Sequence, residues 1–105
     1  MRKVIRYKTA GGREPYTDYL DSLRDRLTAA KMRSRIRRAG LGNLGDYKPV
    51  GNGVLELRMD WGPGFRLYVG LDGDKLIVLM AGDKSTQQRD IMRAHIYLTD
   101  YRGNK

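Results

Sequence analysis

The sequence predicts an α+β fold in which helices pack on a small, twisted and mostly antiparallel sheet. Three observations predict it. Apolar residues recur at helical spacing after a first strand. Apolar and polar residues alternate within consecutive strands in the middle of the chain, which form a meander. A purely apolar run then precedes a last helix. At 105 residues the chain is expected to form one domain, residues 1–105, around a single modest core.

The N-terminal part is predicted to form a strand and a helical hairpin. Residues 3–7 read as the strand, and Pro15 suits the first turn of a helix. One apolar stripe then runs through residues 16–27 and a second through residues 29–39, each at the spacing of a helix face. Thr28 is the expected cap of the second helix, although one bent helix would satisfy the same spacing. The polar face of this region is strongly basic: Arg24, Arg26, Lys31, Arg33, Arg35, Arg37 and Arg38.

The C-terminal part is predicted to form three consecutive strands and a helix. Residues 41–53 read as a loop, and residues 54–59 and 65–70 alternate apolar with polar side chains around a Gly/Pro turn. The apolar run 76–81 returns as a core strand, and a last helix is expected from residue 87 to about residue 101. We expect the helices on one side of the sheet and the polar face of the meander on the other.

The charge balance narrows the class of partner. Twenty-one basic residues against 12 acidic ones give a net charge of +9, which favours a polyanion such as nucleic acid. A basic face for an acidic protein is the alternative, and a membrane surface fits less well because no basic helix has an apolar Trp/Phe/Leu face. No apolar run approaches the roughly 20 residues of a bilayer span, so a cytoplasmic protein is expected.

Several reaction classes lack the residues they require. The chain has no cysteine, so it has neither disulfides nor thiolate metal sites, and no metal or cofactor motif is present. Its one histidine, His95, excludes a pair of histidines as acid and base, and the residue reads as part of a helix face. We expect no cofactor.

The remaining candidates are cations and a tyrosine on the meander. Lys84 lies where the core strand ends and a helix begins, and the spacing of Ser85 and Gln88 is that of a capping box. Arg58 and Arg66 face each other across the hairpin, where the alternative is a surface ion pair with Glu56. The candidate set also includes Lys48 from the preceding loop, Tyr68 as a stacking platform or a packing residue, and Arg37 and Arg38 as RNA-binding residues.

Two stretches carry a family resemblance. The segments are GLGNLGDYKPVGNGVLELRMDWGPGFRLYVG (residues 40–70) and LIVLMAGDKSTQQRDI (residues 76–91), preceded by LDSLRD (residues 20–25). They resemble the RelE/HigB-like toxins of type II toxin–antitoxin systems, within the branch called addiction module killer proteins. The resemblance covers nearly the whole chain beyond the first strand.

The resemblance implies a RelE-like fold with a concave basic surface. It implies an endoribonuclease that cleaves mRNA on the ribosome without a metal, and a helix-turn-helix antitoxin as partner. It also assigns Arg66 as the phosphate-stabilising arginine, Lys84 and Lys48 as the further catalytic cations, and Arg58 as an RNA-binding residue. The toxin alone is expected to be a monomer.

Two other functions fit the same residues. A gyrase-inhibiting toxin of the same superfamily would bind a protein and need no catalytic group. A basic RNA- or protein-binding module would have no toxicity at all.

Overall fold

The computed structural model describes residues 1–104 and contains one five-stranded mixed sheet and three α-helices. The strands are β1 (Lys3–Arg6), β2 (Tyr47–Pro49), β3 (Val54–Arg58), β4 (Phe65–Asp72) and β5 (Lys75–Asp83). The helices are α1 (Pro15–Ser22), α2 (Arg26–Gly40) and α3 (Gln87–Gly103), with a 3₁₀ turn at Lys84–Thr86. The α+β class is therefore confirmed, as are the helical hairpin and the C-terminal helix.

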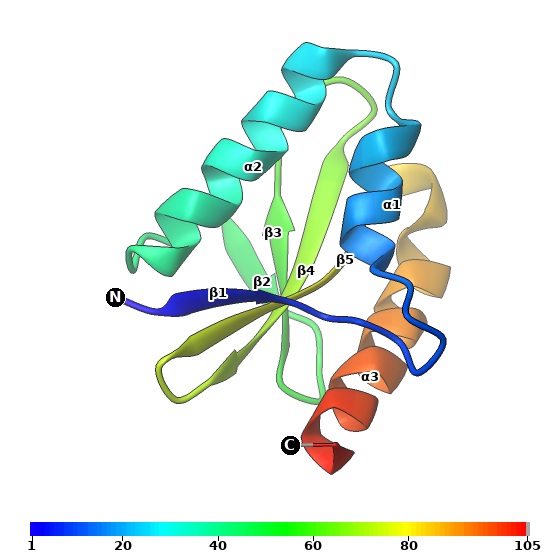
Figure 1. Ribbon diagram of the computed structural model, residues 1–105. Coiled ribbons are helices and arrows are strands. Elements are labelled where there is room, and N and C mark those ends of the chain that lie inside the picture. Colours follow the sequence, from blue (N-terminus) through cyan, green and yellow to red (C-terminus); the bar gives the residue numbers. More distant parts are fainter. Residues whose placement is uncertain (105) are drawn as a thin grey trace.

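The sheet has the strand order β1-β5-β4-β3-β2 (Figure 1). Neighbouring strands are antiparallel except β1 and β5, which are parallel. The short edge strand β2 lies within residues 41–53, where we expected only a loop. The sheet therefore ends in the short strands β1 and β2 at its two edges.

Helices cover both faces of the sheet, which corrects the expectation that they share one side (Figure 1). The α1–α2 hairpin packs on one face through residues such as Tyr16, Met32 and Ile36. The helix α3 packs on the other face through Ala94 and Leu98. The alternation in β3 and β4 predicts one apolar face and one solvent-exposed face, but most of the second face is buried under α3.

A β-bulge in β5 explains how both faces are supplied with apolar side chains. The register pairs Tyr68 with Met80 and Val69 with Val78, which leaves Leu79 without a partner across β4. Leu79 and Met80 therefore both contact the α3 side, although they are adjacent in sequence. An uninterrupted apolar run gives no sign of such a bulge.

Aspartates cap the helical segments at positions that differ from the expected ones. Asp25, rather than Thr28, caps α2 by accepting a hydrogen bond from the Leu27 amide at 3.0 Å, and Thr28 donates its hydroxyl to the same carboxylate at 2.9 Å. Both hydrogen bonds lower the pKa of Asp25, and the bond from the Thr28 hydroxyl contributes more than the bond from the Leu27 amide. Asp83 likewise accepts from the Ser85 amide at 2.8 Å and starts the 3₁₀ turn, in place of the capping box. No helix of the described residues is long and apolar enough to cross a membrane.

Candidate functional site

One row of residues crosses the sheet at the end where β3 finishes and β4 begins. The register places Arg58 opposite Arg66, and Arg66 opposite Gly82. Two residues farther in, on the same face of the sheet, Glu56 lies opposite Tyr68, and both are almost fully buried. The first residue of α3, Gln87, donates its side-chain amide to the Glu56 carboxylate at 2.9 Å. The helix α3 thus covers the pair Glu56 and Tyr68, which we call the Glu56 row. It leaves the pair Arg58 and Arg66, the arginine row, uncovered.

The arginine row opens into a hollow of about 500 Å³, which we call the basic pocket. Its lining includes Arg58, Arg66 and Lys84, so the structure brings together three of the four cations expected to converge. Lys84 is exposed and is the first residue after β5. The remaining lining residues are Asp46, Met59, Asp60, Gly62, Pro63 and Gly64.

Lys48 does not line the basic pocket. It lies in the edge strand β2 instead of a loop, opposite Glu56 of β3, and its side chain is exposed. The expectation that Lys48 lines the same hollow as Arg58, Arg66 and Lys84 is therefore wrong. The sequence predicts a loop at this position because the three residues of β2 are all exposed and show no apolar alternation.

Arg66 is held on two sides. Its Nη1 donates to the Gly64 carbonyl at 3.0 Å and to the Phe65 carbonyl at 3.2 Å, while its Nε lies 4.0 Å from Oε1 of Glu56. Its side chain is only 12% exposed. Gly64 has a φ of +82°, and a Cβ there would lie 3.3 Å from Cβ of Lys84 and 3.4 Å from Nη1 of Arg66. The left-handed φ of Gly64 favours glycine at this turn, and a Cβ there would press closely on the Lys84 side chain.

Glu56 is a buried carboxylate directly behind Arg66, which corrects the expected surface ion pair. It is 1% exposed and accepts hydrogen bonds from the Tyr68 hydroxyl at 3.1 Å and from Gln87. Oε1 of Glu56 and Nε of Arg66 make no hydrogen bond within the described residues, so the charge attraction at 4.0 Å is what joins them. Three elements, β3, β4 and α3, therefore fix the position of one arginine.

Tyr68 has no face available to a base, so its predicted stacking role is wrong. The residue is 0% exposed because α3 packs over it. Burial raises the pKa of Tyr68, and the charge of Glu56 raises it further. The hydroxyl therefore stays protonated at physiological pH and acts as a donor to Glu56.

Arg35 holds the wall of the basic pocket, although its place in the basic stripe predicted an exposed residue. It is 8% exposed and donates to the carbonyls of Arg58 at 2.7 Å, Leu44 at 2.9 Å and Asp46 at 2.7 Å. Burial lowers the pKa of Arg35, with a further contribution from the nearby Arg38 cation. Arg58 itself lies 3.7 Å from the Asp46 carboxylate.

A second hollow of about 480 Å³ adjoins the basic pocket and shares Asp46, Arg58, Met59 and Asp60 with it. It is lined further by Arg38 and Trp61, and Nζ of Lys31 lies 3.0 Å from the centre of the Trp61 ring. Arg38 is thus beside the predicted site, whereas Arg37 lines a separate groove between β1 and α2. The two neighbouring arginines of α2 face different parts of the surface.

The sequence reading missed the carboxylates and the tryptophan of this region. Asp46, Asp60 and Trp61 line one or both hollows, but their sequence context predicts only a loop and a turn. The available signal was an Asp-Trp pair at the start of a Gly/Pro turn between two strands. His95 lies elsewhere, with Nε2 2.9 Å from the Val50 carbonyl. Within the described residues, no three His, Cys, Asp or Glu side chains gather to hold a metal.

One known protein resembles this chain over most of its length. An uncharacterised protein of Haemophilus influenzae is 42% identical over 82 residues, which cover 77% of this chain and 83% of the relative. No protein-family model matches the chain.

Proposed function

This chain belongs to the same family as the uncharacterised Haemophilus influenzae protein, and we propose that it is the toxin of a type II toxin–antitoxin system that cleaves mRNA on the ribosome. The observation that carries the proposal is the convergence of Arg58, Arg66 and Lys84 on one open pocket at the end of the sheet. Three cations on a rigid frame form a site for an anion that is larger than a single carboxylate. The RelE-like fold and a helix-turn-helix antitoxin as partner belong to the same proposal.

The reaction that suits these residues is transfer within the RNA. The 2′-oxygen attacks the adjacent phosphorus, the bond from phosphorus to the 5′-oxygen breaks, and the products are a 2′,3′-cyclic phosphate and a 5′-hydroxyl. One proton leaves the 2′-hydroxyl and one is delivered to the 5′-oxygen. Negative charge builds on the non-bridging phosphate oxygens, and we assign the Arg66 guanidinium to them because it is already oriented by Glu56 and two carbonyls.

Two kinds of group can accept the proton of the 2′-hydroxyl. Lys84 is the first choice, in its neutral form, and the carboxylate of Asp60 lines the same pocket. Single substitutions separate them. If Lys84 is the base, Lys84→Met should lower kcat far more than Asp60→Asn, and the reverse order would assign the role to Asp60.

The adjoining hollow extends the surface for RNA. Arg38 and Lys31 would meet phosphates on one side of the cleaved bond, and Arg58 lines both hollows. Arg58, Arg38 and Lys31 then serve binding more than chemistry. Their replacement should raise KM and flatten the salt dependence more than it lowers kcat.

The test is cleavage of mRNA in a purified translation system, read as new 5′ ends by primer extension. Arg66→Ala should lower the cleavage rate by roughly 10²- to 10³-fold, the loss typical of a removed oxyanion donor. Arg24→Ala is the matched control because Arg24 is an exposed arginine between α1 and α2. Circular dichroism establishes that both variants are folded.

Two results would contradict the proposal. One is a folded Arg66→Ala protein that cuts ribosome-bound mRNA as fast as the wild type. The other is intact mRNA together with inhibited DNA supercoiling by gyrase, which would assign the chain to a protein-binding toxin. Unchanged growth on induction of the protein alone would point to a basic binding module.

A further inference from the structure

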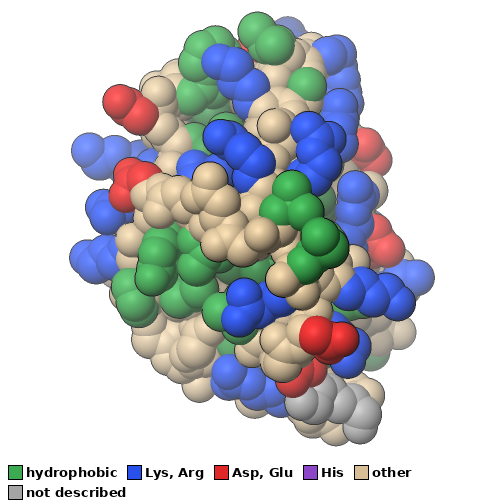
Figure 2. All heavy atoms as spheres, turned by 90° about the vertical axis from the view of Figure 1, so that its left-hand side faces the viewer, with side chains coloured by type: hydrophobic (Ala, Val, Ile, Leu, Met, Phe, Trp, Pro, Cys, Tyr) green, Lys and Arg blue, Asp and Glu red, His purple; other side chains and the backbone are tan. Residues whose placement is uncertain are grey.

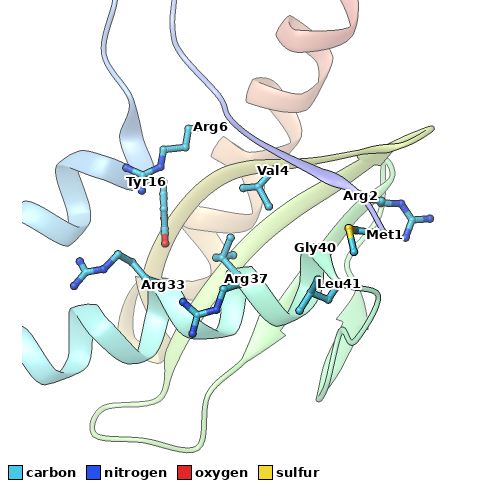
Figure 3. Close-up of a pocket in the computed structure, with 10 residues that line it drawn as sticks. Met1, Arg2, Val4, Arg6, Tyr16, Arg33, Arg37, Gly40 and Leu41 are labelled. Atoms are coloured by element: carbon cyan, nitrogen blue, oxygen red, sulfur yellow. The ribbon is translucent and has the colours of Figure 1, made fainter.

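A groove of about 360 Å³ lies between β1 and the C-terminal half of α2 and shares no lining residue with the basic pocket (Figure 3). Its apolar floor includes Val4, Ile36 and Leu41. Val4 is 39% exposed and Leu41 59%, and Met1 at the same end is 92% exposed. In Figure 3, Val4 points from β1 toward α2, with Arg6 and Tyr16 at one end of the groove and Met1 and Leu41 at the other.

The groove exists because β1 lies close to the end of α2. Gly40 allows this approach, since a Cβ at that position would lie 2.9 Å from Cγ2 of Val4 and 3.3 Å from the Arg2 carbonyl. The Arg2 amide donates to the Gly40 carbonyl at 2.6 Å. The helix is therefore anchored under the edge strand, and its exposed residues extend the floor beyond that strand.

β1 is an edge strand whose outer side is available for pairing. The amides of Lys3 and Tyr7 donate to the carbonyls of Asp74 and Val78, on or beside β5, at 2.7 and 2.9 Å. Backbone direction alternates along a strand, so the amides of Val4 and Arg6 between them point away from β5. An exposed edge beside an apolar groove is the arrangement by which extended peptides add to a sheet.

The rim of the groove is basic. Arg2, Arg6, Arg33 and Arg37 line it, and its described lining contains no aspartate or glutamate. Figure 2, which faces the side of α2 and the N-terminus, shows hydrophobic side chains surrounded mainly by lysine and arginine side chains. The guanidinium of Arg6 lies 5.1 Å from the centre of the Tyr16 ring, so this end of the rim is held in place.

We propose that the groove and the outer edge of β1 bind an extended, acidic segment of a partner protein. The segment pairs with the backbone of Val4 and Arg6 and places alternate apolar side chains on the floor formed by Val4, Ile36 and Leu41. Acidic residues at the ends of this stretch meet the rim arginines. RNA suits the surface less well, because the floor is aliphatic and the one aromatic ring lining it, Tyr16, is 1% exposed beneath Arg6.

Binding here can be measured whether or not the protein cleaves RNA. The probe is a synthetic peptide of about ten residues, with leucine alternating with threonine in the centre and glutamates at both ends. Fluorescence anisotropy gives its affinity for the full-length protein, and hydrogen exchange locates it. Slower exchange is expected at the amides of Val4 and Arg6.

Two matched comparisons isolate the groove. Reversing Arg33 and Arg37 to glutamate should weaken binding about tenfold, whereas reversing Arg24 and Arg93, also exposed and equal in charge, should have much less effect. N-methylation of alternate peptide amides should abolish binding because it removes strand pairing. Val4→Asp should do so by charging the floor, with its fold verified by circular dichroism.

Any of four results would overturn the proposal. These are no binding of the peptide, equal losses in the two charge-reversed pairs, unchanged affinity of the N-methylated peptide, and exchange protection elsewhere than β1. Displacement of the bound peptide by single-stranded RNA would assign the groove to nucleic acid. Protection of β1 on concentrating the protein alone would assign it to a second copy of the chain.

Discussion

Replacing Glu56 with glutamine tests whether a buried carboxylate positions Arg66. The substitution keeps the shape of the side chain and removes its charge. A carboxylate and a guanidinium 4.0 Å apart attract each other by about 4 kcal/mol at an effective dielectric constant of roughly 20, before the desolvation that offsets part of it. Because Glu56 is 1% exposed and the Arg66 side chain 12%, solvent screens this pair little.

Glutamine can still accept a hydrogen bond from Tyr68 or Gln87, but its amide hydrogens would face the arginine cation. We therefore expect Glu56→Gln to lower the free energy of unfolding by roughly 2–3 kcal/mol, and Glu56→Ala by roughly 3–5 kcal/mol. Urea unfolding followed by circular dichroism measures both. Glu14→Gln is the control, because Glu14 lies 4.0 Å from the exposed Lys8 and should change stability by less than about 1 kcal/mol.

The effect on catalysis distinguishes positioning from simple destabilisation. An arginine that has lost its anchor should lower kcat roughly ten- to a hundredfold at temperatures where the variant is fully folded, with KM changed much less. A Glu56→Gln protein with wild-type kcat would refute the positioning role, and one with wild-type stability would refute the electrostatic reasoning. Loss of stability with unchanged kcat would leave Glu56 as a structural residue only.

Three further predictions concern the walls of the site. Arg35→Met should cost roughly 3–5 kcal/mol, because three carbonyls lose a charged donor, whereas Arg38→Met at an exposed position should cost less than about 1 kcal/mol in the same unfolding assay. Gly64→Ala should cost about 1–2 kcal/mol and also lower RNA cleavage, whereas Gly73→Ala, with a φ of +57° and no atom within 4 Å of a Cβ, should cost similar stability and leave cleavage unchanged. Above about pH 10 the protein should lose stability, because the fold raises the pKa of Tyr68 and the tyrosine of the unfolded chain therefore ionises first. The stabilising contribution of the protonated hydroxyl is complete below that pH and is lost as the pH rises. Tyr68→Phe should therefore shift alkaline unfolding to higher pH in a circular dichroism titration.

Local patterns in the sequence predicted most of the elements. The helical stripes, the alternation around the Gly/Pro turn and the apolar run of β5 each depend on residues close together in the chain, so they identify α1, α2, β3, β4 and β5. The parallel pairing of β1 and the covering of the second face by α3 depend on contacts between distant residues. Periodicity within one segment contains no information about them.

The errors at the site have the same origin. Alternation in β3 and β4 correctly placed Arg58, Glu56, Arg66 and Tyr68 on one face, but it could not reveal that α3 covers half of that face. The alternation alone therefore predicts that Glu56 and Tyr68 are surface residues, whereas both are buried. Arg35 was assigned to a solvated stripe for a similar reason, since its role depends on carbonyls of a loop that returns to α2.

The starting point of α3 decides which residues are core and which form the site. β5 ends at Asp83, the 3₁₀ turn occupies the next three residues, and α3 begins at Gln87, whose side chain reaches the Glu56 row. A helix that began one turn earlier would extend about 5.4 Å farther along the sheet and would cover the row that contains Arg58 and Arg66. Asp83 sets this spacing by accepting the Ser85 amide, so its capping bond matters to the site although its side chain does not line the basic pocket. The basic pocket therefore exists because the Asp83 cap fixes where the helical segment begins. The buried carboxylate of Glu56 compensates the charge of Arg66, which remains partly enclosed.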